Sequence, residues 1–155
     1  RLPQGYLTRM EDGRTYGEAL LDPTPIYVPV VDDLLAQGVV PHYAANITGH
    51  GWRKLMRAAE PFVYIIDRVP EPQPVFRFMQ RHGPVSVEEA YGNLNMGAGF
   101  ALYLAPGDVD RARAVAGKHG VTALAAGYVE KRGRDKRVVI RPLGIEYGGE
   151  SLGVR

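Results

Sequence analysis

The sequence predicts an α/β (α+β) fold in which helices pack on a mixed β-sheet. Three observations support this fold class. Some segments repeat their apolar residues at helical spacing, others are short β-branched or aromatic runs, and the two kinds alternate along the chain. A chain of 155 residues with 45% hydrophobic and 23% charged residues is also long enough for one domain with a substantial core.

Helices are predicted where the apolar period is close to 3.6 and an end signal follows. Val30, Leu34 and Leu35 repeat at that spacing before Gly38. Ser86 begins a capping-box pattern and is the predicted N-cap of a further helix. The predicted helices are residues 29–37, a segment from Trp52 to Pro61, residues 74–81, the segment after Ser86, and residues 108–119.

Strands are predicted where short apolar runs lack that period, namely at residues 42–47, 62–66, 100–104, 122–129 and 137–141. The last two runs flank a polar connection that contains Gly133, and this pattern is typical of a β-hairpin. Residues 1–25 are polar and rich in turn residues, so we expect an extended lead-in. Residues 26–141 form the expected domain, and residues 142–155, which show no period, a C-terminal tail.

Composition excludes several classes of function. A net charge of +2 is too small to predict nucleic-acid or membrane binding. The chain has no cysteine, which excludes disulfides, thiolate nucleophiles and cysteine-based metal sites. No second histidine stands at metal-ligand spacing from His50, so no metal site is predicted. Without an apolar run of about 20 residues or a signal peptide, a soluble cytoplasmic protein is expected.

The basic run 131–137 contains five basic residues and one acid. A nucleic-acid site would need aromatic or groove-shaped support nearby, so the favoured interpretation is a solvated hairpin tip.

Two glycine-rich turns are the candidate binding sites. The strand at 42–47 runs into the sequence Thr-Gly-His-Gly before a predicted helix, a context in which backbone N–H groups can hold a phosphate. The alternative is a tight turn without a ligand. His50 could act as a base or ligand there, or only as a hydrogen-bonding loop residue. The turn at 93–100 offers asparagine amides to a ligand, or serves only as the entry to a strand.

Four segments occur in a recognisable order: DPTPIYV at 22–28, ANITGHG at 45–51, VFRFMQ at 75–80 and NMGAG at 95–99. Together they resemble the C-terminal domain of the phosphoribosylformylglycinamidine cyclo-ligases, also called AIR synthases, of purine biosynthesis. The resemblance runs from about residue 16 to residue 140. It implies an AIR synthase-like C-terminal domain at 26–141, with residues 1–25 leading in from an N-terminal domain that is missing here.

The resemblance also implies a reaction. In the family, ATP phosphorylates the amide oxygen of formylglycinamidine ribonucleotide, and a ring nitrogen then displaces phosphate to form aminoimidazole ribonucleotide. The missing N-terminal domain would supply most of the ATP and magnesium site and would form the homodimer. The implied partners of residues 1–155 are that domain and the phosphorylated ribonucleotide, and the chain alone is expected to be inactive.

The family's Thr-Gly-Gly-Gly and Asn-Met-Gly segments carry over onto particular residues. The implied substrate-binding set is Asn46, Thr48, Gly49, His50, Gly51, Asn95, Met96 and Gly97. Two positions depart from the family: Asn46 stands where many members have histidine, and His50 where they have the middle glycine. Asn46 cannot replace a histidine as an acid or base, whereas His50 can titrate, so these two residues are the candidates for a catalytic role.

Two other functions stay open from the sequence. One is a paralogous ATP-dependent enzyme of the same superfamily, such as a selenophosphate, thiamine-phosphate or hydrogenase-maturation enzyme, although the Asn-Met-Gly segment favours AIR synthase. The other is a standalone ligand-binding or interaction domain, which the absent N-terminal half and the basic run would fit.

Overall fold

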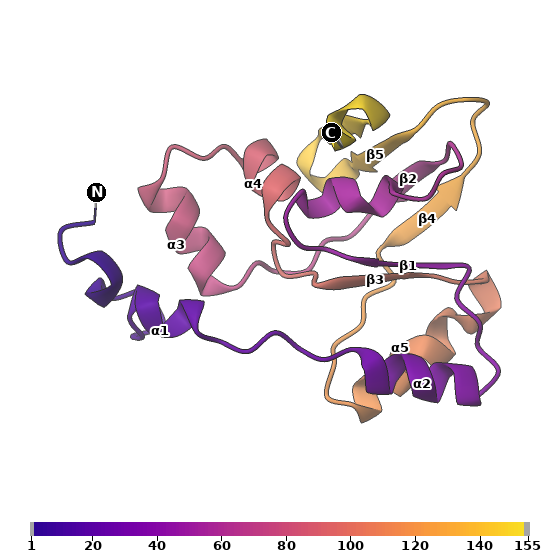
Figure 1. Ribbon diagram of the computed structural model, residues 1–155, viewed down its shortest axis with the longest axis horizontal. Coiled ribbons are helices and arrows are strands. Elements are labelled where there is room, and N and C mark those ends of the chain that lie inside the picture. The colour runs from indigo at the N-terminus through magenta and orange to yellow at the C-terminus, as the bar shows by residue number, and fades with distance from the viewer. Residues whose placement is uncertain (1, 154–155) are drawn as a thin grey trace.

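The computed structural model describes residues 2–153 and contains two β-sheets with helices around them (Figure 1). The α-helices are α1 (Tyr16–Leu20), α2 (Val28–Ala36), α3 (Pro74–His82), α4 (Val87–Asn93) and α5 (Val109–Lys118). The strands are β1 (Tyr43–Asn46), β2 (Val63–Ile66), β3 (Phe100–Tyr103), β4 (Gly127–Glu130), β5 (Arg137–Ile140) and β6 (Ile145–Gly148). The predicted fold class is confirmed, with two sheets in place of one.

The larger sheet is mixed and has the strand order β4-β2-β5-β6. Strand β2 lies parallel to β5 and antiparallel to β4, and all four of its side chains are buried. A fully apolar strand is stable only where it is covered on both faces, which explains its central position. The predicted hairpin of 122–129 with 137–141 is therefore wrong, because β2 separates β4 from β5.

The expected C-terminal tail is also wrong, because it contains a strand of this sheet. Strand β6 pairs antiparallel with β5, and its residues alternate between buried and exposed. Ile145 and Tyr147 are each only 7% exposed and belong to the main core. Two inward-facing residues are too few to show a period of two in the sequence, but they are enough to hold an edge strand against the core.

The smaller sheet is the antiparallel pair β1 and β3, which lies between the larger sheet and the helices α2 and α5 (Figure 1). Ala101 and Tyr103 pack against the main core, whereas Leu102 and Leu104 pack against the core formed by α2 and α5. Because successive side chains of a strand point to opposite faces, β3 connects the two cores.

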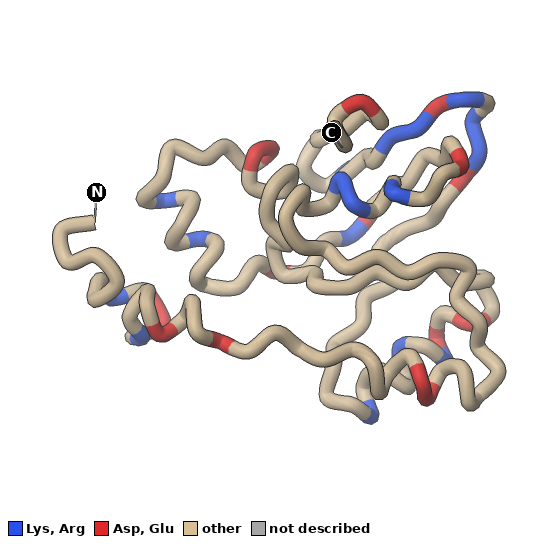
Figure 2. The backbone as a smooth tube through the Cα atoms, in the orientation of Figure 1, with Lys and Arg blue, Asp and Glu red and all other residues tan. Residues whose placement is uncertain are grey.

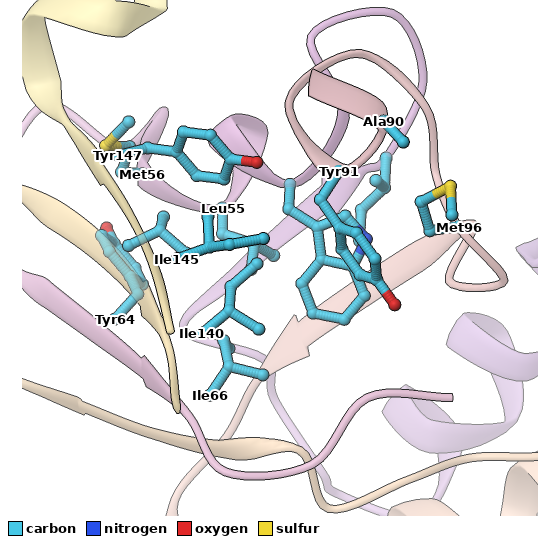
Figure 3. Packing of buried hydrophobic residues seen from close by; sticks show 13 residues of the cluster. Leu55, Met56, Tyr64, Ile66, Ala90, Tyr91, Met96, Ile140, Ile145 and Tyr147 are labelled. Carbon is cyan, nitrogen blue, oxygen red and sulfur yellow. The ribbon is translucent and has the colours of Figure 1, made fainter. Parts of the chain in front are cut away.

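The main core joins the larger sheet to α4 and to a 3-10 helix, η2 (Gly51–Met56) (Figure 3). The α-helix predicted from Trp52 to Pro61 is replaced by this shorter element. Trp52, Leu55 and Met56 are all buried. Their spacing of three and four residues predicted a buried face correctly, but it does not distinguish a 3-10 turn from an α-helix.

The lead-in at 1–25 was expected to be extended, and the structure differs within it. Thr15 caps α1 through a reciprocal capping box with Glu18. Met10, Ala19 and Phe78 form a third, smaller core between this segment and α3. The predicted N-cap role of Ser86 is confirmed, because its hydroxyl accepts a hydrogen bond from the N–H of Glu89 at 3.0 Å. Among the described residues, no helix is long and apolar enough to cross a bilayer.

Candidate functional site

The pairing of β1 with β3 brings the two glycine-rich turns together. Asn46, the last residue of β1, lies opposite Phe100, the first residue of β3. The pairing continues one step further, because the N–H of Ile47 donates to the carbonyl of Gly99 at 2.9 Å. In an antiparallel pair the end of one strand meets the start of the other, so the turn after β1 and the turn before β3 share one edge.

A pocket of about 430 Å³ lies at this edge. Its volume falls within the range of small-molecule sites. Asn46, Thr48, Gly49 and Asn95 line it, so four of the eight predicted substrate-binding residues meet at one pocket. The other lining residues are Thr24, Ile47, Phe76, Asn93, Leu94 and Gly99.

The first turn owes its shape to two left-handed residues. His50 has φ 77° and Gly51 has φ 50°. A Cβ at Gly51 would lie 2.2 Å from the carbonyl oxygen of Tyr91, so only glycine allows this close packing. The side chain of His50 is exposed and is not part of the pocket wall. Gly51 therefore sets the backbone of the turn, and His50 projects beside the pocket.

The second turn is anchored by its own side chains. The carboxamide oxygen of Asn95 accepts a hydrogen bond from the N–H of Gly97 at 3.1 Å, and the carbonyl of Asn95 accepts one from Trp52 Nε1 at 2.9 Å. Met96 is fully buried in the main core (Figure 3). Gly97, at φ 96°, packs against the backbone of Glu71. Met96 and Gly97 thus hold the turn from outside the pocket wall, and their contact with substrate stays a prediction.

Arg53 supports the pocket wall through hydrogen bonds from its guanidinium group. Its guanidinium donates to the carbonyls of Gly92 at 2.7 Å and Ser151 at 2.9 Å, and to the side-chain oxygen of Asn93 at 3.0 Å. The side-chain amide of Asn93 donates in turn to the carbonyl of Glu89 at 2.9 Å. Both ends of the Asn93 side chain are therefore engaged, which sets its orientation in the wall.

Lys54 approaches the first turn from η2. Its ammonium group donates to the hydroxyl oxygen of Thr48, which lines the pocket. Burial and then the nearby charge of Arg57 lower the pKa of Lys54. Neither Arg53 nor Lys54 was among the predicted site residues. The only signal in the sequence was the basic pair directly after the glycine turn.

The lining residues outside the implied substrate-binding set come from four parts of the chain: Thr24, Ile47, Phe76, Asn93, Leu94 and Gly99. The last three lie within the candidate turn at 93–100. Thr24 and Phe76 lie in two of the segments that carry the family resemblance, so that resemblance was the signal that could have placed them. Asn93 and Gly99 flank the Asn-Met-Gly segment. Gly99 leaves room for Tyr27, whose hydroxyl would lie 2.3 Å from a Cβ at that position, and Tyr27 stacks on Phe100 at 4.9 Å.

The pocket wall contains hydroxyl, amide and backbone groups but no carboxylate, imidazole or ammonium group. Within residues 2–153 there is also no group of three or more histidine, aspartate or glutamate side chains that could hold a metal ion. Such a wall can bind and orient a polar molecule through neutral hydrogen bonds. Its described lining residues include no carboxylate, the ligand that Mg²⁺ prefers.

The basic run 131–137 does not reach this pocket. Figure 2 shows Lys and Arg gathered in the connection between β4 and β5. Acidic neighbours accompany several of these residues: Lys131 lies 3.8 Å from Glu60, and Arg137 lies 2.8 Å from Asp135. The predicted hairpin tip is instead a loop that passes the N-terminal end of β2 and joins the strands on its two sides. The absence of nucleic-acid binding stays a prediction.

Comparison with known proteins identifies relatives that are named phosphoribosylformylglycinamidine cyclo-ligase. No protein-family model matches the chain. The chain is 37% identical over 122 residues to the phosphoribosylformylglycinamidine cyclo-ligase of Methanocaldococcus jannaschii, which covers 78% of the chain and 35% of that relative. It is 40% identical over 119 residues to the enzyme of the same name from Methanothermobacter thermautotrophicus, covering 77% and 34%.

A longer match is to the cyclo-ligase of Methanococcus maripaludis strain C7, with 32% identity over 149 residues. It covers 94% of the chain and 42% of that relative. The chain thus spans only about a third to two fifths of the length of the relatives it matches. Over that part, the chain is a homologue of the phosphoribosylformylglycinamidine cyclo-ligases, the AIR synthases.

Proposed function

We propose that this chain is the C-terminal, substrate-binding domain of a cytoplasmic phosphoribosylformylglycinamidine cyclo-ligase. The reaction would be the ATP-dependent closure of formylglycinamidine ribonucleotide to aminoimidazole ribonucleotide in purine biosynthesis. The observation that carries the proposal is that Asn46, Thr48, Gly49 and Asn95 line one pocket together, because these residues come from the two segments that resemble the family's substrate loops. The identity of 31–40% to enzymes with this name supports it.

The pocket wall suits the binding part of this reaction. Ring closure needs the substrate amide and the ring nitrogen to be held close together, and oriented hydrogen-bond donors and acceptors can do this without a nucleophile. Neutral groups on Asn46, Thr48 and Asn95 would contact the ribonucleotide. The wall has no carboxylate for Mg²⁺, so ATP and magnesium are assigned to an N-terminal domain of the longer polypeptide, which would also form a homodimer.

The test is an assay of the longer polypeptide with ATP, Mg²⁺ and formylglycinamidine ribonucleotide. We expect aminoimidazole ribonucleotide, ADP and phosphate in equal amounts, measured by mass spectrometry. Folded protein that forms no product would refute the proposal. Residues 1–155 alone should be inactive, and turnover by them would contradict the assignment of ATP to a separate domain.

A variant then tests the pocket itself. Asn46→Ala should raise KM about tenfold, because it removes one or two hydrogen bonds to the substrate. Gln4→Ala is the matched control, since Gln4 is exposed and lies outside the pocket. An unchanged KM for Asn46→Ala would remove Asn46 from the binding set.

One observation favours a second candidate, a paralogue that acts on a different substrate. Asn46 lines the pocket where many family members have histidine, and the exposed His50 stands where they have glycine. Turnover of ATP with another phosphorylated substrate, and none with formylglycinamidine ribonucleotide, is the result that would favour it.

A further inference from the structure

Lys54 is a positively charged residue next to a pocket whose lining residues are neutral. It lies in η2 (Gly51–Met56), directly after the glycine turn, and its ammonium group is bonded to the hydroxyl of Thr48. Thr48 is one of the lining residues, and Lys54 contacts the pocket through it without being a lining residue itself. An ammonium group has three N–H donors, and this contact uses one of them.

The charge of Lys54 is not neutralised by the protein. Within the described part of the chain, no carboxylate lies within 4.0 Å of Lys54, in contrast to Lys131, Arg137 and several other surface cations. Its charged neighbour is instead Arg57, a second cation, which together with burial lowers the pKa of Lys54. The charge of Arg57 disfavours the charged form of Lys54, and a bound anion would offset this effect.

Arg53, the other cation at the pocket, is already engaged. Its guanidinium donates to three backbone carbonyls, those of His50, Gly92 and Ser151, and to the side chain of Asn93. An anion would have to displace these bonds to reach Arg53. Within residues 2–153, Lys54 makes only one side-chain hydrogen bond, to the Thr48 hydroxyl, and can keep it while binding an anion. Lys54 is therefore the cation available for anion binding.

We propose that Lys54 and Thr48 form the binding site for a phosphate monoester at the Asn46–Gly49 side of the pocket. The ammonium group and the Thr48 hydroxyl would both donate to phosphate oxygens, and the neutral amides of Asn46 and Asn95 would hold the sugar. This inference deepens the proposed function, since the phosphate would be that of the ribonucleotide. It names Lys54 as the residue that selects a phosphorylated substrate.

The test measures binding in the longer polypeptide by calorimetry, with ribose 5-phosphate, ribose and ATP as separate probes. We expect ribose 5-phosphate to bind and ribose not to bind measurably. Lys54→Met should weaken ribose 5-phosphate about tenfold or more, because a charge-assisted hydrogen bond is lost. Lys54→Arg should keep part of the affinity. ATP affinity should be the same in wild type and Lys54→Met, and a parallel loss would assign the phosphate to ATP and overturn the proposal.

Lys118→Met is the matched control, because Lys118 is exposed near the end of α5 and lies outside the pocket. Thermal unfolding of each variant separates lost folding from lost binding. A folded Lys54→Met protein that binds ribose 5-phosphate as tightly as wild type would overturn the inference. The two proposals can fail separately. If ribose 5-phosphate binding depends on Lys54 but no aminoimidazole ribonucleotide is formed, only the proposed function is refuted. If the enzyme turns over and Lys54→Met leaves KM unchanged, only this inference is refuted.

Discussion

At the scale of single residues, the pocket depends on two glycines with opposite surroundings. Gly51 has a positive φ and backbone atoms of Tyr91, Asn93 and Leu94 within 3 Å of where a Cβ would stand. Gly49, two residues earlier, has no heavy atom within 4 Å of that position. The same substitution at the two sites therefore separates backbone strain from ligand contact.

Gly51→Ala should destabilise the protein, because left-handed backbone costs a non-glycine residue about 1–3 kcal/mol even before the clash with Tyr91 is added. Gly49→Ala should change the free energy of unfolding by no more than about 0.5 kcal/mol. It should instead weaken ligand binding, because Gly49 lines the pocket and a Cβ there would meet no protein atom within 4 Å, so the added methyl group would take up space open to a ligand. Denaturant unfolding measures both variants. Equal stability of the two would contradict the geometry of the turn.

At the scale of elements, β6 stabilises the larger sheet and also supports the pocket wall indirectly. It buries Ile145 and Tyr147 against the main core, and the η5 turn (Gly149–Leu152) that follows it presents the carbonyl of Ser151 to Arg53. The C-terminal strand thereby supports the side chain that orients Asn93 in the pocket wall.

Ile145→Ala should lower the free energy of unfolding by about 2–4 kcal/mol, the usual cost of truncating a buried isoleucine. Glu146→Ala is the control on the same strand. Glu146 is exposed and pairs with Arg137 at 3.1 Å, and such surface pairs contribute about 0–1 kcal/mol. Chemical denaturation compares the two. A loss at Ile145 no larger than that at Glu146 would contradict the role of β6 in the core.

The pairing of α2 with α5 should depend on pH. Gln37 and then His119 donate hydrogen bonds to Asp33, and these contacts lower the pKa of the Asp33 carboxyl below its usual value of 3.8. A carboxyl with a lowered folded-state pKa stabilises the fold above its unfolded-state pKa, and that contribution is lost as the pH falls through the folded-state pKa.

Asp33→Asn should therefore melt at a lower temperature than wild type at neutral pH, and the two should converge as the pH falls well below 3.8. Asp32→Asn, at the exposed neighbouring position, should match wild type throughout. Melting curves over this pH range make the comparison. A difference that grew towards acid pH would show that Asp33 is not stabilised as the carboxylate.

At the scale of the whole molecule, the three hydrophobic cores differ greatly in size. Among residues 2–153, the main core contains 13 buried residues, the core between α2 and α5 contains six, and the core beside α1 contains three. Because local opening costs less free energy where fewer apolar groups are buried, these parts should open separately.

Backbone amides of β2 and β5 should therefore exchange with solvent most slowly, and those of α1 fastest among the helices. Strand β2 is paired on both sides and fully buried, whereas α1 has five residues and only Ala19 is buried. Hydrogen exchange followed by mass spectrometry reads both regions in one experiment. Protection of α1 equal to that of β2 would show that the lead-in and the main sheet unfold as one unit.

Local patterns in the sequence predicted the elements that form from nearby residues. The ends of helices α2, α3 and α5 lie within one residue of the predicted ends. Periodicity, proline and glycine determine helix ends through contacts within a few residues, so such ends can be predicted. The cap at Ser86 depends on Glu89, three residues away, and was also predictable. Pairing between distant strands was not, so the β4–β5 hairpin was predicted wrongly and β6 was missed.

The sequence by itself determined the fold class, most helix positions and the glycine turns, since each follows from contacts within a few residues. It also carried the family resemblance. Only the tertiary structure decided which turn residues share a pocket, because that depends on the antiparallel pairing of β1 with β3 across more than 50 residues. In the folded chain, Met96 is buried in the core and His50 lies outside the pocket wall. Long-range packing therefore separated the residues that line the pocket from those that only shape it.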